Sequence, residues 1–200
     1  MKSKLILACS LLFATFSFSN AQKLQSGDIA PLKGEKVFNV KYEYENLVVG
    51  DKKEDVYISE KMADKDKKEP GTGEKWKTEW YGNRASKYQP KFEELMNNYF
   101  KEKGILAASD KPEAKYTIIL KTKRMEPGFN VGVMRKPAAI DVVISIVETS
   151  SNKEIANLIM NDVPGRDAMG YDFDASYRIS EAYAKCGKSV AKFIIKKLDL

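Results

Sequence analysis

The sequence contains no histidine among its 200 residues. Histidine supplies the general base of Ser-His-Asp and Cys-His catalytic groups, and it is the commonest ligand at zinc and copper sites. Its absence therefore excludes those catalytic arrangements and the usual histidine-based metal centres. We expect no catalytic residues, no cofactor and no metal site, which makes a non-enzymatic binding protein the leading hypothesis.

Cysteine is also scarce, and its two positions are Cys9 and Cys186. Cys9 lies in the N-terminal leader described below, so a mature chain would keep one thiol and could form no internal disulfide. Cys186 falls in the apolar stripe of a predicted helix. Two interpretations stay open for it: a small buried core residue, or a reactive thiol that pairs with another molecule.

Long apolar runs are confined to the N-terminus. Residues 1–21 begin with the basic MKSK, continue through the apolar LILACSLLFATFSF and end in SNA. This pattern is typical of a secretory signal peptide cleaved after Ala21. A lipoprotein leader that uses Cys9 is the alternative, although only Leu5 to Ala8 would then form its apolar segment. We expect an exported protein, periplasmic or secreted, without a transmembrane segment in the mature chain.

The chain has little excess of charge of either sign. Removal of Lys2 and Lys4 with the leader lowers the formal net charge from +6 to +4, because 32 basic residues then face 28 acidic ones. The charges alternate along the chain, whereas a nucleic-acid-binding protein concentrates basic residues on one surface. We therefore expect no nucleic acid among the partners, and instead a protein or glycan of the cell envelope.

Four segments show the alternation of apolar and polar residues that is typical of β-strands. The first, residues 36–49, places Phe38, Val40, Tyr42 and Tyr44 on one face. The third segment, residues 138–149, is apolar on both faces, which predicts a central strand. It is predicted to form an antiparallel hairpin with the fourth segment, residues 154–163. The other three predicted strands occupy residues 114–125, 138–149 and 154–163.

Helical periodicity separates and follows these strands. Residues 51–87 are predicted as a helical insertion, which begins with a polar helix and is interrupted by PGTG at residues 70–73. After this break, Trp76 and Trp80 lie one helical turn apart. Two further amphipathic helices are predicted over residues 90–103 and 175–198.

This order of elements predicts an α+β fold. We expect one mixed four-stranded sheet in the order β-α-β-β-β-α, with helices packed on it and the helical insertion 51–87 after the first strand. Residues 22–35 contain glycine and proline without periodicity and are predicted as an extended N-terminal arm. Residues 36–200 would then form a single domain.

A β-α-β-β-β-α order in an exported chain resembles the N-terminal domain of TolB and the related CsgG-like and transport-auxiliary envelope proteins. The sequence is also similar to uncharacterised exported proteins with EPGxGEKW followed by YxPKFEEL, here EPGTGEKW at residues 69–76 and YQPKFEEL at residues 88–95. The topological resemblance spans residues 36–198 and rests on element order. It implies a binding or assembly role at the cell envelope and supplies no catalytic residues.

The basic, aromatic stretch around the two tryptophans is the first candidate binding site. Its candidate residues are Trp76, Trp80, Tyr81 and Arg84. Aromatic rings flanked by cations suit sugar rings, peptides or anionic ligands. However, two tryptophans at i and i+4 are also what a helix needs to pack its apolar face on a core, and this packing role is the preferred interpretation.

A loop bounded by glycine and proline, residues 125–136, is the second candidate binding surface. It carries Phe129, Met134 and Arg135.

Two other classes of function stay open. An envelope glycan hydrolase would need a cleft with two carboxyl groups about 5 to 10 Å apart. A small-ligand carrier would need an apolar cavity of at least about 300 Å³.

Overall fold

A computed structural model describes residues 23–131, 134–165 and 175–200 of the chain. The signal peptide predicted for residues 1–21 lies outside these described residues. Within the described ranges, no helix combines the length and the apolar character that crossing a membrane requires. The described residues form an α+β fold, as the sequence predicts.

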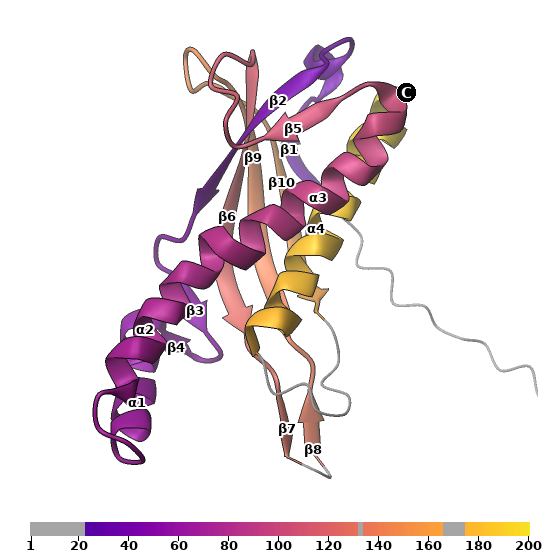
Figure 1. The fold of residues 1–200 in the computed structure, drawn as a ribbon. Coiled ribbons are helices and arrows are strands. Elements are labelled where there is room, and N and C mark those ends of the chain that lie inside the picture. Colours follow the sequence, from indigo (N-terminus) through magenta and orange to yellow (C-terminus); the bar gives the residue numbers. More distant parts are fainter. Residues whose placement is uncertain (1–22, 132–133, 166–174) are drawn as a thin grey trace, which may run out of the picture.

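A mixed β-sheet forms the centre of the molecule (Figure 1). Its strands are β1 Lys23–Gly27, β2 Val37–Glu43, β3 Val48–Val49, β4 Lys52–Lys53, β5 Leu106–Ala108, β6 Tyr116–Glu126, β9 Ala139–Glu148 and β10 Glu154–Pro164. They follow the order β1-β10-β9-β6-β2-β5, and β3 joins β4 to β6. Strand β2 runs parallel to β5 and β6, whereas β6, β9, β10 and β1 form antiparallel pairs.

The prediction of four strands is wrong, because the described residues build a sheet of eight. The four predicted strands correspond to β2, β6, β9 and β10, and β9 does lie between two neighbours. The additional strands β3, β4 and β5 have two or three residues each, too few to show an alternating pattern.

Strand β1 lies within the range predicted as an extended arm. It pairs antiparallel with β10, and a 3₁₀ helix, Ala30–Leu32, follows it. Gly27 ends the strand with φ of +80°, and a Cβ on it would lie 2.0 Å from the carbonyl oxygen of Ile155. Only glycine suits that position, because it tolerates both the positive φ and the close approach of β10.

The helices are α1 (Glu54–Asp66), α2 (Thr72–Asn83), α3 (Gln89–Phe100) and α4 (Ala175–Leu198). A π-helical turn, Arg84–Tyr88, joins α2 and α3 into one continuous helical run, where the sequence predicts a new helix at Pro90. The N–H of Gln89 donates to the carbonyl of Arg84, five residues earlier. Proline lacks an N–H, so the wider turn accommodates the hydrogen bond that Pro90 cannot make.

Helices α3 and α4 lie side by side across one face of the sheet (Figure 1). Their closest approach is at Gly187, where a Cβ would lie 2.1 Å from the carbonyl oxygen of Phe92. Cys186 is fully buried beside it, and its Sγ lies 3.9 Å from the sulfur of Met160. Burial raises the pKa of the Cys186 thiol, which supports the small core residue among the two interpretations of this cysteine.

Candidate binding sites

Trp80 occupies a packed position on α2. Its side chain is 6% exposed, and its indole N–H donates to the Glu54 carboxylate at 2.7 Å. Its ring lies 5.3 Å from that of Tyr57 and 5.6 Å from that of Trp76, measured between centroids. Its neighbours enclose most of the Trp80 ring, which agrees with the packing role preferred from the sequence, although the ring also forms part of a cavity wall described below.

Arg84 is engaged by the same cluster. Its guanidinium donates to the Glu54 carboxylate and lies 4.2 Å from the centre of the Tyr44 ring and 5.0 Å from that of Tyr81. The side chains of Arg84 and Glu54 are only 19% and 15% exposed. Of the four residues predicted in this region, Tyr81 is exposed and Trp76 is partly buried.

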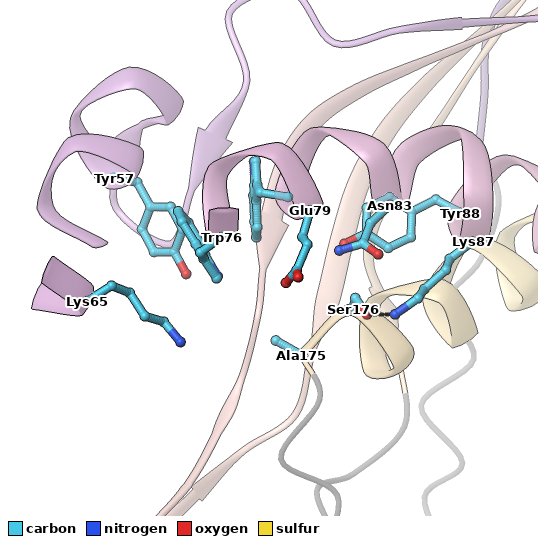
Figure 2. Close-up of a pocket in the computed structure, with 10 residues that line it drawn as sticks. Tyr57, Lys65, Trp76, Glu79, Asn83, Lys87, Tyr88, Ala175 and Ser176 are labelled. Carbon is cyan, nitrogen blue, oxygen red and sulfur yellow. Dashed lines mark hydrogen bonds between the residues drawn. The ribbon is translucent and has the colours of Figure 1, made fainter. Parts of the chain in front are cut away.

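A cavity of about 400 Å³ opens beside Trp76. We call it the Trp76 cavity. Its walls come from α1, α2, the π-helical turn and the first turn of α4, and Figure 2 shows how these elements surround the space. The lining side chains that matter below are Tyr57, Lys65, Trp76, Glu79 and Asn83.

Three polar side chains that line the Trp76 cavity have no partner in the part of the chain that the structure describes. Among the described residues, the side chains of Lys65, Glu79 and Asn83 make no hydrogen bond or ion pair. One turn earlier on α2, by contrast, Glu74 and Lys77 pair at 3.4 Å. Figure 2 shows Lys65 and Glu79 reaching into the same space. The cavity therefore presents an ammonium, a carboxylate and an amide that the described part of the fold leaves unused.

The remaining wall of the cavity combines aromatic rings with a second ammonium, that of Lys87. The ring of Tyr57 lies 6.1 Å from that of Trp76. Burial, with a smaller contribution from the negative charge of Glu126, raises the pKa of Tyr57 to about 12. Its hydroxyl therefore stays protonated at neutral pH and can donate a hydrogen bond. At the far end, Lys87 donates to the Ser176 hydroxyl and links the π-helical turn to α4.

The sequence did not single out Lys65, Glu79 and Asn83 of this cavity, although it contained a signal for two of them. Trp76, Glu79 and Asn83 follow one another at i, i+3 and i+7, so they share one face of α2. Lys65 comes from α1, and its position opposite that face depends on how the two helices pack. Helical spacing could have found the first group but not the lysine.

The second candidate surface is a short hairpin. Strands β7 (Phe129–Val131) and β8 (Met134–Lys136) pair antiparallel and form a two-stranded sheet separate from the main one. Figure 1 shows this hairpin projecting beyond the end of the sheet. Phe129 and Met134 are 42% and 60% exposed, and Arg135 is exposed beside them. The three predicted residues therefore lie together on one projecting element.

The root of the hairpin is held firmly. Arg178 of α4 is 4% exposed, and its guanidinium donates to the carbonyl of Pro127 at 3.1 Å and to that of Gly128 at 3.4 Å. The Glu126 carboxylate accepts the N–H of Gly128 at 3.0 Å and forms an ion pair with Lys136. These contacts fix the direction in which the hairpin leaves the sheet.

A second cavity, of about 320 Å³, lies between α1 and the hairpin root. Two of its lining carboxylates are already paired, Glu60 with Lys52 and Glu126 with Lys136. No group of three or more possible metal ligands occurs among the described residues. Asp64 pairs with Lys67 at 3.8 Å, so Asp51 is the lining carboxylate without an ion pair to another described residue.

No family model and no curated protein matches the sequence. Among solved structures, the chain is similar to the PelC dodecamer from Paraburkholderia phytofirmans, with 13% identity over 82% of this chain and 97% of that chain and a TM-score of 0.38. A point variant of that PelC gives 12% identity, the same coverage and a TM-score of 0.37. These TM-scores are too low to support an inference, so the resemblance to TolB and CsgG-like domains stays a prediction.

Proposed function

We propose that the protein is an exported, non-enzymatic domain that docks onto a partner protein of the cell envelope through the β7–β8 hairpin. One observation carries the proposal: the hairpin projects beyond the sheet with Phe129 and Met134 exposed by 42% and 60%. Phenylalanine, methionine and arginine are enriched where proteins bind one another. Arg135, exposed beside the two apolar side chains, completes that combination.

The anchored root supports the same role. A flexible loop loses conformational entropy when it binds, and this loss weakens the complex. Because Arg178 and Glu126 hold the backbone at Pro127 and Gly128, the root of the hairpin is positioned before a partner binds. Such an arrangement suits recognition by a preformed surface.

A glycan hydrolase receives less support from the structure. The Trp76 cavity has one described carboxylate in its wall, that of Glu79. In the second cavity, Glu60 and Glu126 are each paired with a lysine. A retaining or inverting hydrolase needs two carboxyl groups placed on either side of one bond, and the single described carboxylate of the Trp76 cavity does not provide such a pair.

Site-specific photo-crosslinking in the producing cells tests the proposal. A photoreactive amino acid at position 134 should give a discrete protein adduct, because Met134 would lie within the contact. The matched control is Lys197, which is exposed near the opposite end of the molecule and should give no such adduct. Replacing Phe129 with serine should reduce the adduct. Equal adducts from positions 134 and 197, or none from 134, would contradict the proposed docking surface.

A further inference from the structure

The Trp76 cavity is separate from the hairpin surface, and no residue of β7 or β8 lines it. Its volume of about 400 Å³ lies within the range of small-ligand sites, roughly 300 to 1,000 Å³. Such sites combine an apolar wall with a few convergent polar groups. The ring of Trp76 supplies the first, and Lys65, Glu79 and Asn83 supply the second.

The charges of the cavity determine which ligand would fit. Lys65 and Glu79 carry opposite charges, face the same space and are not paired with any described residue. A neutral sugar would leave both charges without a counterpart, and a simple anion would leave the carboxylate of Glu79 facing a like charge. Charge complementarity therefore favours a ligand with both an ammonium and a carboxylate.

We propose that the Trp76 cavity binds a free amino acid with an apolar or aromatic side chain. Its ammonium would lie against the Glu79 carboxylate and its carboxylate against the Lys65 ammonium. Its side chain would lie against the rings of Trp76 and Tyr57, and the Asn83 amide can accept from or donate to either ligand terminus.

The two tryptophans of the chain give this proposal a direct optical readout. Both line the cavity, so all tryptophan fluorescence arises at the site. L-Phenylalanine is a suitable probe because it does not absorb where tryptophan is excited. Three further probes show how much the two charged groups of the ligand contribute to binding. N-acetyl-L-phenylalanine lacks the ammonium, L-phenylalaninamide lacks the carboxylate, and maltotriose represents neutral sugars.

L-Phenylalanine should change the fluorescence and bind at least about 10-fold more tightly than either blocked analogue, since each analogue loses one charge-assisted hydrogen bond. Chemical shift changes in NMR spectra provide a second measurement of the same affinities. Equal affinity for phenylalanine and both analogues, binding of maltotriose instead, or no phenylalanine binding at about 10 mM would each overturn the proposal.

Two substitutions assign the charges to their residues. Glu79→Gln should weaken phenylalanine binding about 10-fold and leave N-acetyl-phenylalanine unaffected, because that analogue has no ammonium to lose. Lys65→Gln should weaken phenylalanine and leave phenylalaninamide unaffected. The control Glu74→Gln changes the same helix outside the cavity and should stay within about 2-fold of the unsubstituted protein. If Glu74→Gln weakens binding as much as Glu79→Gln, the assignment is wrong.

Discussion

Trp76 and Trp80 lie one turn apart on the same helix, yet their surroundings differ. Trp80 is 6% exposed, and Glu54 accepts its indole N–H. Trp76 is partly buried, and Lys65, Glu79 and Asn83, which line the cavity beside it, have no partner among the described residues. The same residue type at helical spacing is thus almost fully buried at one position and only partly buried at the other, although both rings contribute to the cavity wall. What decides between them is whether the fold itself satisfies the neighbouring polar groups.

This comparison separates two kinds of substitution. Substitutions of side chains that pack or pair within the fold, at Glu54 or between α3 and α4, should lower the free energy of unfolding. Substitution of Glu79, which lines the Trp76 cavity, should alter ligand binding and leave that free energy nearly unchanged. The predictions below run from the largest expected loss of stability to the smallest.

The largest effect is expected where packing is closest. Gly187→Ala would place a Cβ 2.1 Å from the carbonyl oxygen of Phe92, so α4 must move away from α3. We expect the free energy of unfolding to fall by about 3 kcal/mol, measured by chemical denaturation. The matched control is Gly82→Ala on α2, where a Cβ meets nothing within 4 Å. That change should stabilise by about 0.5 to 1 kcal/mol through helix propensity. Similar losses at both glycines would contradict the packing described for α3 and α4.

The Glu54 contacts should have a smaller but clear effect. Glu54→Gln removes the negative charge that pairs with Arg84 in a site that is 15% to 19% exposed. The free energy of unfolding should fall by about 2 kcal/mol, because the charge of Arg84 then stays largely buried without its counterpart. Glu60→Gln breaks an exposed pair with Lys52 and should leave the free energy of unfolding nearly unchanged. Equal costs would show that burial does not distinguish the two pairs.

Substitution of Glu79 in the Trp76 cavity should cause almost no loss of stability. Glu79→Gln changes the charge of a side chain that has no partner among the described residues, so the free energy of unfolding should stay within about 0.5 kcal/mol. Thermal and chemical denaturation of this variant beside Glu54→Gln give the comparison directly. A loss near 2 kcal/mol would mean that Glu79 supports the fold, and it would remove the distinction between Glu79 and the buried Glu54.

Local periodicity was sufficient for the long elements of the fold. Strands β2, β6, β9 and β10 and helix α4 all bury a continuous apolar face, and each produces its own repeat in the sequence. Strand β1 produces no such repeat, because its pairing with β10 joins residues about 130 positions apart and its residues Gln25 and Ser26 are exposed. The number of strands was therefore wrong at the edges of the sheet, where pairing depends on distant backbone.

The candidate sites also contain some residues that local sequence patterns identify and others that such patterns cannot identify. The exposed apolar residues of the β7–β8 hairpin stand out in a loop bounded by glycine and proline, and the sequence identified Phe129 and Met134. Partners from other elements were missed. Glu54 precedes Trp80 by 26 residues, and Arg178 follows the hairpin root by about 50. Their contacts arise only when α1, α2, α4 and the sheet are packed together.

The central claim is that Trp76 exposes its ring to an accessible cavity, whereas Trp80, which also contributes to the cavity wall, is almost fully buried. The most direct test is acrylamide quenching of tryptophan fluorescence in Trp80→Phe, which leaves Trp76 as the sole emitter. Trp76 should be quenched readily, and about 10 mM L-phenylalanine should protect it because the ligand would cover its ring. If Trp76 is as protected as Trp80 is in the converse variant Trp76→Phe, or if phenylalanine leaves the quenching unchanged, the account of this cavity is contradicted.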